Sequence, residues 1–133
     1  MSLLQIRGVT KRFGGLVAVK DMEFDVQPHE VMGIIGPNGS GKSTMINMIS
    51  GSFAPTAGSI RLKGHELAGE PAHRINRLGV ARTFQLVRLL PELSVVQNVV
   101  AGAAFGHRRR WGASAERFAM DLLSRVGLAG VAG

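Results

Sequence analysis

Apolar and polar residues follow one another with several spacings along this chain, and each spacing predicts a type of element. Residues 4–9 are predicted to form a first strand, followed by a turn over residues 10–15, where glycines and charges gather. Residues 21–26 alternate strictly between acidic and apolar side chains, the pattern of a strand with one face in water. Both strands are expected to pair in an antiparallel layer.

A continuous apolar run predicts the next strand. Residues 31–35 carry no polar side chain and lead into a glycine-rich segment, which is typical of a strand buried on both faces in a parallel sheet. Residues 43–50 place apolar side chains over most of a helical surface, and Gly51 is positioned to end that helix. The predicted local unit is therefore a strand, a glycine loop and a buried helix.

Shorter elements follow. A short exposed strand is expected over residues 59–63, and a small helix begins at Pro71 and ends at Gly79. Residues 80–84 then predict a strand that carries Gln85 at its end.

Two further helices are predicted after this point. Ser94 and Gln97 match a capping box, in which each side chain binds a free backbone N–H of the other residue, so a helix is expected from here to about Ala104. Residues 115–126 have the spacing of an amphipathic helix. Its expected apolar stripe consists of Phe118, Leu122 and Val126.

Composition narrows the class of protein. The chain has 133 residues, 45% of them hydrophobic and 19% charged, which is typical of one globular domain and excludes intrinsic disorder. A net charge of +7 favours an anionic partner such as a nucleotide, a nucleic acid or a lipid surface. The absence of cysteine excludes disulfides and thiolate metal sites. The N-terminus does not have the pattern of a signal peptide, and no apolar run is long enough to cross a membrane.

Residues 36–43 read G-P-N-G-S-G-K-S and fit the phosphate-loop pattern G-x-x-x-x-G-K-[ST]. In this pattern the backbone N–H groups and the helix start converge on one anion, and glycines leave room for its oxygens. We expect Lys42 to reach the β- and γ-phosphates, the Ser43 hydroxyl to bind Mg²⁺, and Thr44 to contact the α-phosphate. The whole predicted nucleotide-binding loop consists of Gly36, Pro37, Asn38, Gly39, Ser40, Gly41, Lys42, Ser43 and Thr44.

Four segments in order resemble the nucleotide-binding domain of ABC transporters. They are T-K-R-F-G-G-L-V-A-V at 10–19, I-I-G-P-N-G-S-G-K-S-T at 34–44, S-G-x₃-P-T-x-G-S-I at 50–60 and A-R-T-F-Q at 81–85. Within that family the chain is most similar to the ATPases of branched-chain amino-acid importers, and importers of urea or short amides resemble it too. The resemblance implies a phosphate-loop NTPase core of α/β class with parallel strands, an antiparallel β layer and the start of a helical subdomain.

The resemblance also assigns two residues outside the loop. It places Phe13 where an aromatic ring stacks on adenine, although a phenylalanine at a strand end can equally be a core residue. It places Gln85 on the catalytic glutamine that contacts Mg²⁺ and the attacking water. The implied domains are an ATP-binding core with its antiparallel layer over residues 1–85 and a partial helical subdomain over 86–133.

The family's signature motif, its Asp-Glu pair and its switch histidine have no counterpart in the sequence. We therefore expect the N-terminal half of such a domain, with an unpaired strand edge, low stability or oligomerisation, and weak nucleotide binding without turnover. The complete protein would be an ATPase that uses Mg²⁺ and ATP, pairs with a second ATP-binding subunit, and docks on a membrane-spanning permease at the cytoplasmic face.

Two other hypotheses stay open from the sequence. The basic and aromatic residues 107–111 allow a nucleic-acid-binding module, although a solvated loop is the commoner role of such a run and no nucleic acid is expected. Residues 86–100, which in the family receive the permease, allow a non-catalytic interaction fragment, and their leucines can equally belong to a core.

Overall fold

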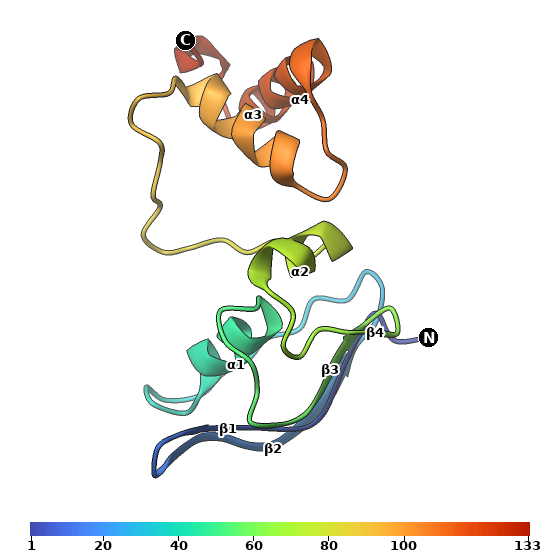
Figure 1. Cartoon of the computed structure of the whole chain (residues 1–133). Helices are drawn as coiled ribbons and strands as arrows, with labels where there is room; N and C mark the ends of the chain where they lie inside the picture. Colours follow the sequence, from blue (N-terminus) through green and yellow to red (C-terminus); the bar gives the residue numbers. More distant parts are fainter. The chain divides into compact units, whose positions relative to one another are not determined.

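A four-stranded antiparallel sheet forms the N-terminal part of the chain (Figure 1). The computed structural model describes residues 1–133. The strands are β1 (Leu4–Phe13), β2 (Leu16–Val26), β3 (Ala57–Leu62) and β4 (His65–Glu66), and their order in the sheet is β2-β1-β3-β4. The helices are α1 (Lys42–Ile49), α2 (Ala72–Leu78), α3 (Val95–Phe105) and α4 (Gly112–Arg125), followed by a 3₁₀ turn, Ala129–Val131. The chain divides into two compact units, Met1–Leu78 and Gly79–Gly133.

The predicted antiparallel pairing of the first two strands is confirmed. Ile6 in β1 lies opposite Phe24 in β2 and opposite Ile60 in β3, so β1 is the central strand. Both strands are longer than predicted, because β1 continues through the expected turn as far as Phe13. Only a two-residue turn then separates it from Leu16, with which it pairs.

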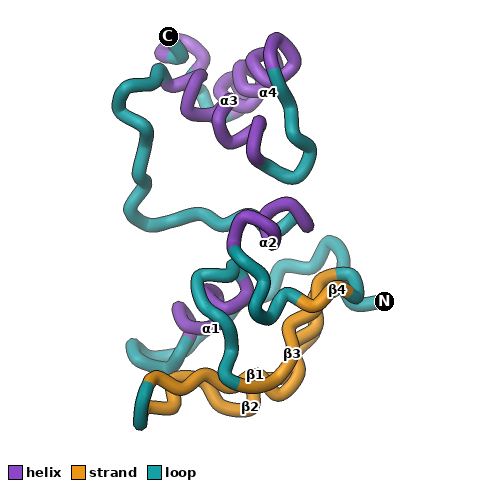
Figure 2. The backbone as a smooth tube through the Cα atoms, in the orientation of Figure 1, coloured by secondary structure: helices purple, strands orange, loops and turns teal.

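Two predicted strands are absent. Residues 31–35 and 80–84 form no strand and lie in loops, which Figure 2 colours teal. The outer residues of the first run, Val31 and Ile35, are 98% and 94% exposed. A strand exists only where another strand accepts and donates its hydrogen bonds. The expected parallel sheet is therefore not formed, and the sheet that is present is entirely antiparallel.

Helix α1 forms where it was predicted and ends as predicted at Gly51. The N–H of Gly51 donates to the carbonyl of Met48 at 3.3 Å, and the N–H of Ser52 donates to Asn47 at 2.9 Å. These two bonds, with Gly51 at φ 79°, define a Schellman cap. The helix buries Met45 and Met48, but Ile46 is 39% exposed, so it is amphipathic rather than buried all round as expected.

In the second unit the predicted capping box is present. The Ser94 hydroxyl accepts from the N–H of Gln97 at 3.3 Å, and the Gln97 side chain accepts from the N–H of Ser94 at 2.9 Å. Helix α3 starts at the next residue and extends to Phe105, one residue beyond the predicted end.

The apolar stripe predicted for α4 is wrong in its details. The buried residues of α4 are Ala115, Ala119 and Leu123, whereas Leu122 and Val126 are exposed. Alanines allow two helices to approach closely, and α3, which packs on α4, also contributes a buried alanine, Ala104. Close packing of small side chains therefore decides which face of α4 is buried.

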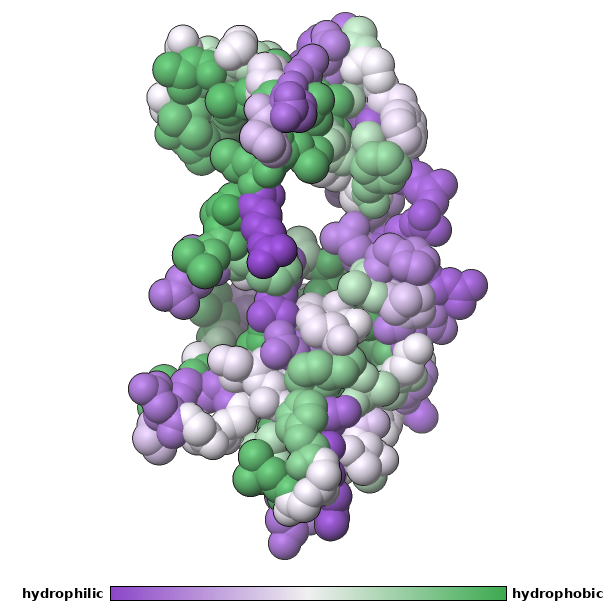
Figure 3. All heavy atoms as spheres, turned by 60° about the vertical axis from the view of Figure 1, so that its left-hand side comes forward, coloured by the Kyte–Doolittle hydropathy of each residue, from purple (hydrophilic) through white to green (hydrophobic).

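Hydrophobic residues also lie at the surface, as Figure 3 shows by its green atoms. Besides Val31 and Ile35, this exposed set includes Leu86 at 85%, Val87 at 71% and Phe105 at 69%. None of the helices has both the length and the apolar character that a membrane span requires.

Candidate nucleotide-binding site

The glycine loop turns so sharply that two of its glycines adopt the left-handed conformation. Gly39 has φ 84° and Gly41 has φ 92°, a region that costs other residues about 1–2 kcal/mol. A Cβ atom on Gly41 would lie 2.4 Å from the carbonyl oxygen of Ala18 and 3.0 Å from the side chain of Val19. The loop is therefore packed directly against β2, and only glycine fits at position 41.

Lys42 folds back over the loop that precedes it. Its ammonium donates to the carbonyl of Gly36 at 2.5 Å and to the carbonyl of Pro37 at 2.7 Å, and it lies 3.4 Å from the hydroxyl of Ser40. The positive charge is thus held within the loop rather than extended into water.

The first turn of α1 offers unpaired donors to an anion. Gly41 caps the helix without a side-chain hydrogen bond, and the turn contains no acidic residue. The N–H groups of Lys42, Ser43 and Thr44 belong to this turn, whereas the N–H of Met45 already donates to Gly41. Such N–H groups have no acceptor within the helix, and the helix dipole adds positive potential around them. The geometry is that of a phosphate site.

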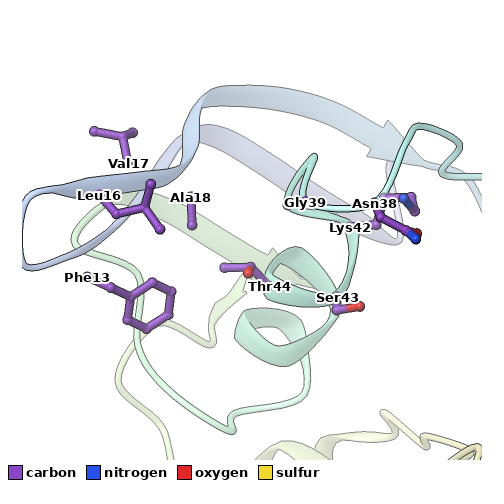
Figure 4. Close-up of a pocket in the computed structure, with 10 residues that line it drawn as sticks. Phe13, Leu16, Val17, Ala18, Asn38, Gly39, Lys42, Ser43 and Thr44 are labelled. Carbon is purple, nitrogen blue, oxygen red and sulfur yellow. The ribbon is translucent and has the colours of Figure 1, made fainter.

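A cavity of about 380 Å³ opens beside this turn, within the range of small-molecule sites. It is lined by the glycine loop, the start of α1, the end of β1 and the start of β2 (Figure 4). The lining residues are Phe13, Leu16, Val17, Ala18, Asn38, Gly39, Gly41, Lys42, Ser43 and Thr44. Figure 4 shows Phe13 and Leu16 at one end, Asn38 and Lys42 at the other, and Thr44 between them. The cavity thus has an apolar end and a cationic end.

Phe13 is a half-exposed residue of the cavity wall, with 45% of its surface accessible. Its ring meets the ring of Phe53 edge-to-face, with 5.3 Å between centroids and an interplanar angle of 87°. Lys11 places its ammonium 5.1 Å from the Phe13 centroid. The alternative that Phe13 is a buried core residue does not fit this exposure.

The residues at the cationic end fit a magnesium nucleotide. Ser43 is exposed and lines the cavity, so its hydroxyl is accessible as one oxygen ligand. Mg²⁺ usually takes only one or two protein oxygens and completes its shell with phosphate oxygens and water. No group of three or more acidic or histidine side chains could hold a metal by itself. A single hydroxyl beside a phosphate site therefore suits a metal that arrives with its nucleotide.

Gln85 belongs to the second unit, whereas the glycine loop belongs to the first. It is exposed and lies in the non-helical segment between α2 and α3, not at the end of a strand. A mainly apolar hollow is lined by its sequence neighbours Arg82, Thr83, Phe84, Leu86, Val87 and Arg88, but Gln85 itself does not line it.

Two carboxylates of the sheet have lowered pKa values, and both lie outside the cavity. The guanidinium of Arg7 donates to Asp25 and lowers the pKa of that carboxyl. At Glu66, burial alone would raise the pKa, but the hydrogen bonds it accepts outweigh burial and lower it. Neither group lines the cavity, so the cavity's charge comes from Lys42 and the helix start.

Three residues of the cavity wall and two residues behind it were not identified from the sequence. Leu16, Val17 and Ala18 form its apolar wall, and Lys11 and Phe53 contact Phe13. None of the wall residues carries a functional group, so only their position three to five residues after Phe13 could have indicated them.

A glycine loop between an antiparallel layer and a helix defines a phosphate-loop nucleotide-binding fold. Comparison with known proteins identifies the family within this class. Residues 19–132 match the family described as ABC transporter. The chain therefore belongs to the ABC transporter family, and it has the fold of the family's ATP-binding cassette. The predicted resemblance is confirmed.

The similar curated proteins are transport ATP-binding proteins. Over 98 residues the chain is 48% identical to the high-affinity branched-chain amino acid transport protein BraF of Pseudomonas aeruginosa and 45% identical to LivG of Escherichia coli K12. These matches cover 74% of this chain and 38% of each relative. The ribose import protein RbsA 1 of Rubrobacter xylanophilus is 38% identical over 130 residues, 95% of this chain and 26% of its own.

Solved cassettes have the same fold. MJ1267, an ATP-binding cassette of an ABC transporter in its ADP conformation, matches 99% of this chain and 56% of its own, with a TM-score of 0.86 and 26% identity. The dimeric cassette MJ0796 matches 98% of this chain and 60% of its own, with a TM-score of 0.82 and 26% identity. The chain thus spans little more than half the length of these cassettes.

Proposed function

We propose that this chain is the nucleotide-binding part of an ATP-driven ABC importer subunit. The observation that carries the proposal is the single cavity with the glycine loop at one end and the ring of Phe13 at the other. A nucleoside triphosphate has the same division, with a charged chain at one end and a planar base at the other. The proposal is also supported by family membership and by the transport proteins to which the chain is similar.

Each end of the cavity has a role in this proposal. The ammonium of Lys42 leaves the carbonyls of its own loop and binds the β- and γ-phosphates, while the N–H groups of the first turn of α1 bind phosphate oxygens. The Ser43 hydroxyl takes one position on Mg²⁺, and Thr44 contacts the α-phosphate. Phe13 stacks on the adenine. In the complete protein, Gln85 would be the glutamine that the family resemblance assigns to Mg²⁺ and the attacking water.

Hydrolysis by this chain alone is not part of the proposal. Phosphoryl transfer to water needs a group that orients or deprotonates the water, commonly a carboxylate. No carboxylate lines the cavity. We therefore infer weak nucleotide binding without turnover for these residues, and ATPase activity for a complete protein with a second ATP-binding subunit.

We infer the transported solute and the partners from the names of the relatives. BraF and LivG are named for branched-chain amino acid transport and RbsA 1 for ribose import. We infer a branched-chain amino acid or a similar small polar solute, since the matches to BraF and LivG have the higher identity. The permease, and a location at the cytoplasmic face of its membrane, belong to the same inference.

Calorimetric titration with Mg-ATP tests the proposed site. Lys42→Ala should weaken binding at least about tenfold, or about 1.4 kcal/mol, because the phosphates lose their cation. Lys20→Ala is the matched control, since Lys20 is an exposed lysine of β2 that does not line the cavity. Equal affinity of Lys42→Ala and the wild-type chain would show that the loop is not the site. Phosphate release by the wild-type chain that Lys42→Ala abolishes would contradict the absence of turnover.

A further inference from the structure

Three side chains behind the apolar end of the cavity form one compact group, consisting of Lys11, Phe13 and Phe53. Lys11 and Phe13 are two residues apart on β1, so their side chains project from the same face of the strand. The Lys11 ammonium lies 5.1 Å from the centroid of Phe13 and 4.9 Å from that of Phe53. Both distances are within the range of cation–π attraction.

Hydrogen bonds fasten this group to the sheet. The Lys11 ammonium donates to the carbonyl of Ala54 at 2.7 Å. The N–H of Arg12 donates to the hydroxyl of Thr56 at 3.0 Å, and the N–H of Thr56 donates to the carbonyl of Thr10 at 2.8 Å. The chain that carries Phe53 is therefore tied to three consecutive residues of β1, which fixes Phe53 relative to Phe13.

Only one member of the group lines the cavity. Phe13 is a lining residue, whereas Lys11 and Phe53 contact its ring and line no part of the cavity. An exposed phenylalanine at a strand end would otherwise rotate among its rotamers. The edge-to-face contact at 87° restricts that rotation and holds the ring in one orientation at the cavity wall.

We propose that Lys11 and Phe53 are positioning residues for a purine base, Phe53 by fixing the ring of Phe13 and Lys11 by polarising it. A cation near an aromatic ring draws π-electron density toward itself, which leaves the ring a better stacking partner for an electron-rich base. The selected ligand is a nucleoside triphosphate rather than any polyphosphate. This inference rests on the proposed function, because it assumes that the base stacks on Phe13.

The test compares a nucleoside triphosphate with a chain of three phosphates that carries no nucleoside. The 133-residue chain is titrated with Mg-ATP and with magnesium tripolyphosphate, for the wild type, Phe53→Ala and Lys11→Met. Each variant should bind Mg-ATP about two- to fivefold more weakly, the range of one cation–π or aromatic contact at an exposed site. Affinity for tripolyphosphate should stay within twofold. Phe53→Tyr and Lys11→Arg keep the ring and the charge, and should restore Mg-ATP affinity.

Lys20→Met is the matched control for loss of a lysine charge, and far-UV circular dichroism melts show whether each variant is folded. If Phe53→Ala does not fold, Phe53→Leu and Lys11→Met carry the test. Equal losses for both ligands would overturn the inference, because they would indicate a general charge or folding effect. Unchanged Mg-ATP affinity in the folded variants would also overturn it. The proposed function fails separately, if Lys42→Ala changes the affinity of neither ligand.

Discussion

The side chain of Asn98 forms two hydrogen bonds with the backbone of Leu90. Its Oδ1 accepts from the Leu90 N–H at 2.8 Å, and its Nδ2 donates to the Leu90 carbonyl at 3.1 Å. The same Nδ2 also lies 3.1 Å from the carbonyl of Leu93 and 3.0 Å from that of Ser94. One amide therefore holds the segment before α3 in place, much as a neighbouring strand would.

Replacing Asn98 should release this segment. Asn98→Leu has a similar volume but satisfies none of these backbone groups, so amide exchange at Leu90 should become at least about tenfold faster, which corresponds to about 1.4 kcal/mol of local stability. Hydrogen exchange measured by NMR checks this. Gln97→Leu removes the capping-box acceptor of the Ser94 N–H but no bond to Leu90, so it controls for a weakened start of α3 and should leave Leu90 protected. Unchanged exchange at Leu90 in Asn98→Leu would contradict the assigned role.

Gly41 and Gly39 provide a matched pair for the packing of the loop. Both have positive φ, but a Cβ at Gly41 would lie 2.4 Å from the oxygen of Ala18, whereas one at Gly39 would meet nothing within 4 Å. Gly39→Ala should cost only the conformational strain of about 1–2 kcal/mol. Gly41→Ala adds a clash with the backbone of β2 and should cost at least about 1 kcal/mol more. Urea unfolding compares the two, and equal losses would show that the close contact is unimportant.

The carboxylate of Glu66 should make the first unit sensitive to acid. Burial opposes its charge, but hydrogen bonds from the Ser59 hydroxyl, from the N–H groups of Ile60 and Ala68, and from Arg61 lower its pKa below the reference value of 4.5. Because the native pKa is below the unfolded one, this contribution is complete above pH 4.5 and is lost as pH falls through the native pKa.

Urea midpoints measured between pH 6 and pH 3 test this. The midpoint should fall less steeply with acid in Glu66→Gln than in the wild type, because the glutamine cannot be protonated. Glu92→Gln, at an exposed position of the second unit, should behave like the wild type. A Glu66→Gln profile parallel to the wild-type profile would contradict the assignment.

The buried alanines of α4 predict the effect of added volume in the second unit. Ala119 is fully buried, whereas Leu122 is 36% exposed. Ala119→Leu should destabilise the unit by about 1–3 kcal/mol through overpacking, and Leu122→Ala should cost less than about 1 kcal/mol. Thermal unfolding at 222 nm measures both. A larger loss of stability in Leu122→Ala than in Ala119→Leu would instead support the apolar stripe predicted from the sequence.

Local signals predicted local structure well in this chain. The glycine loop, the capping box and the glycine that ends α1 each depend on a few neighbouring residues, and all three are present. Residues 31–35 and 80–84 depend on hydrogen-bond partners elsewhere, and their apolar character alone could not supply these partners. The face of α4 depends on which neighbour it meets, so large apolar residues at helical spacing were a poor guide to burial.

The same distinction applies to the candidate site. The residues that carry charge or hydroxyls were predictable, because the spacing of a phosphate loop is specific. The wall formed by Leu16, Val17 and Ala18 depends on how β2 lies against the loop, which is a tertiary relationship. The contact of Phe53 with Phe13 joins residues 40 positions apart and could not be predicted from either alone.

The hydrogen bonds that the Lys42 ammonium makes within its own loop would compete with a bound nucleotide for the same cation. The carbonyls of Gly36 and Pro37 accept its hydrogen bonds. In the proposed function a nucleotide replaces these internal ligands, so part of its intrinsic affinity is offset by bonds that Lys42 already makes within the loop. Binding of this kind exchanges the partners of one cation, so its cost is that of breaking the Lys42 bonds rather than that of folding a flexible segment.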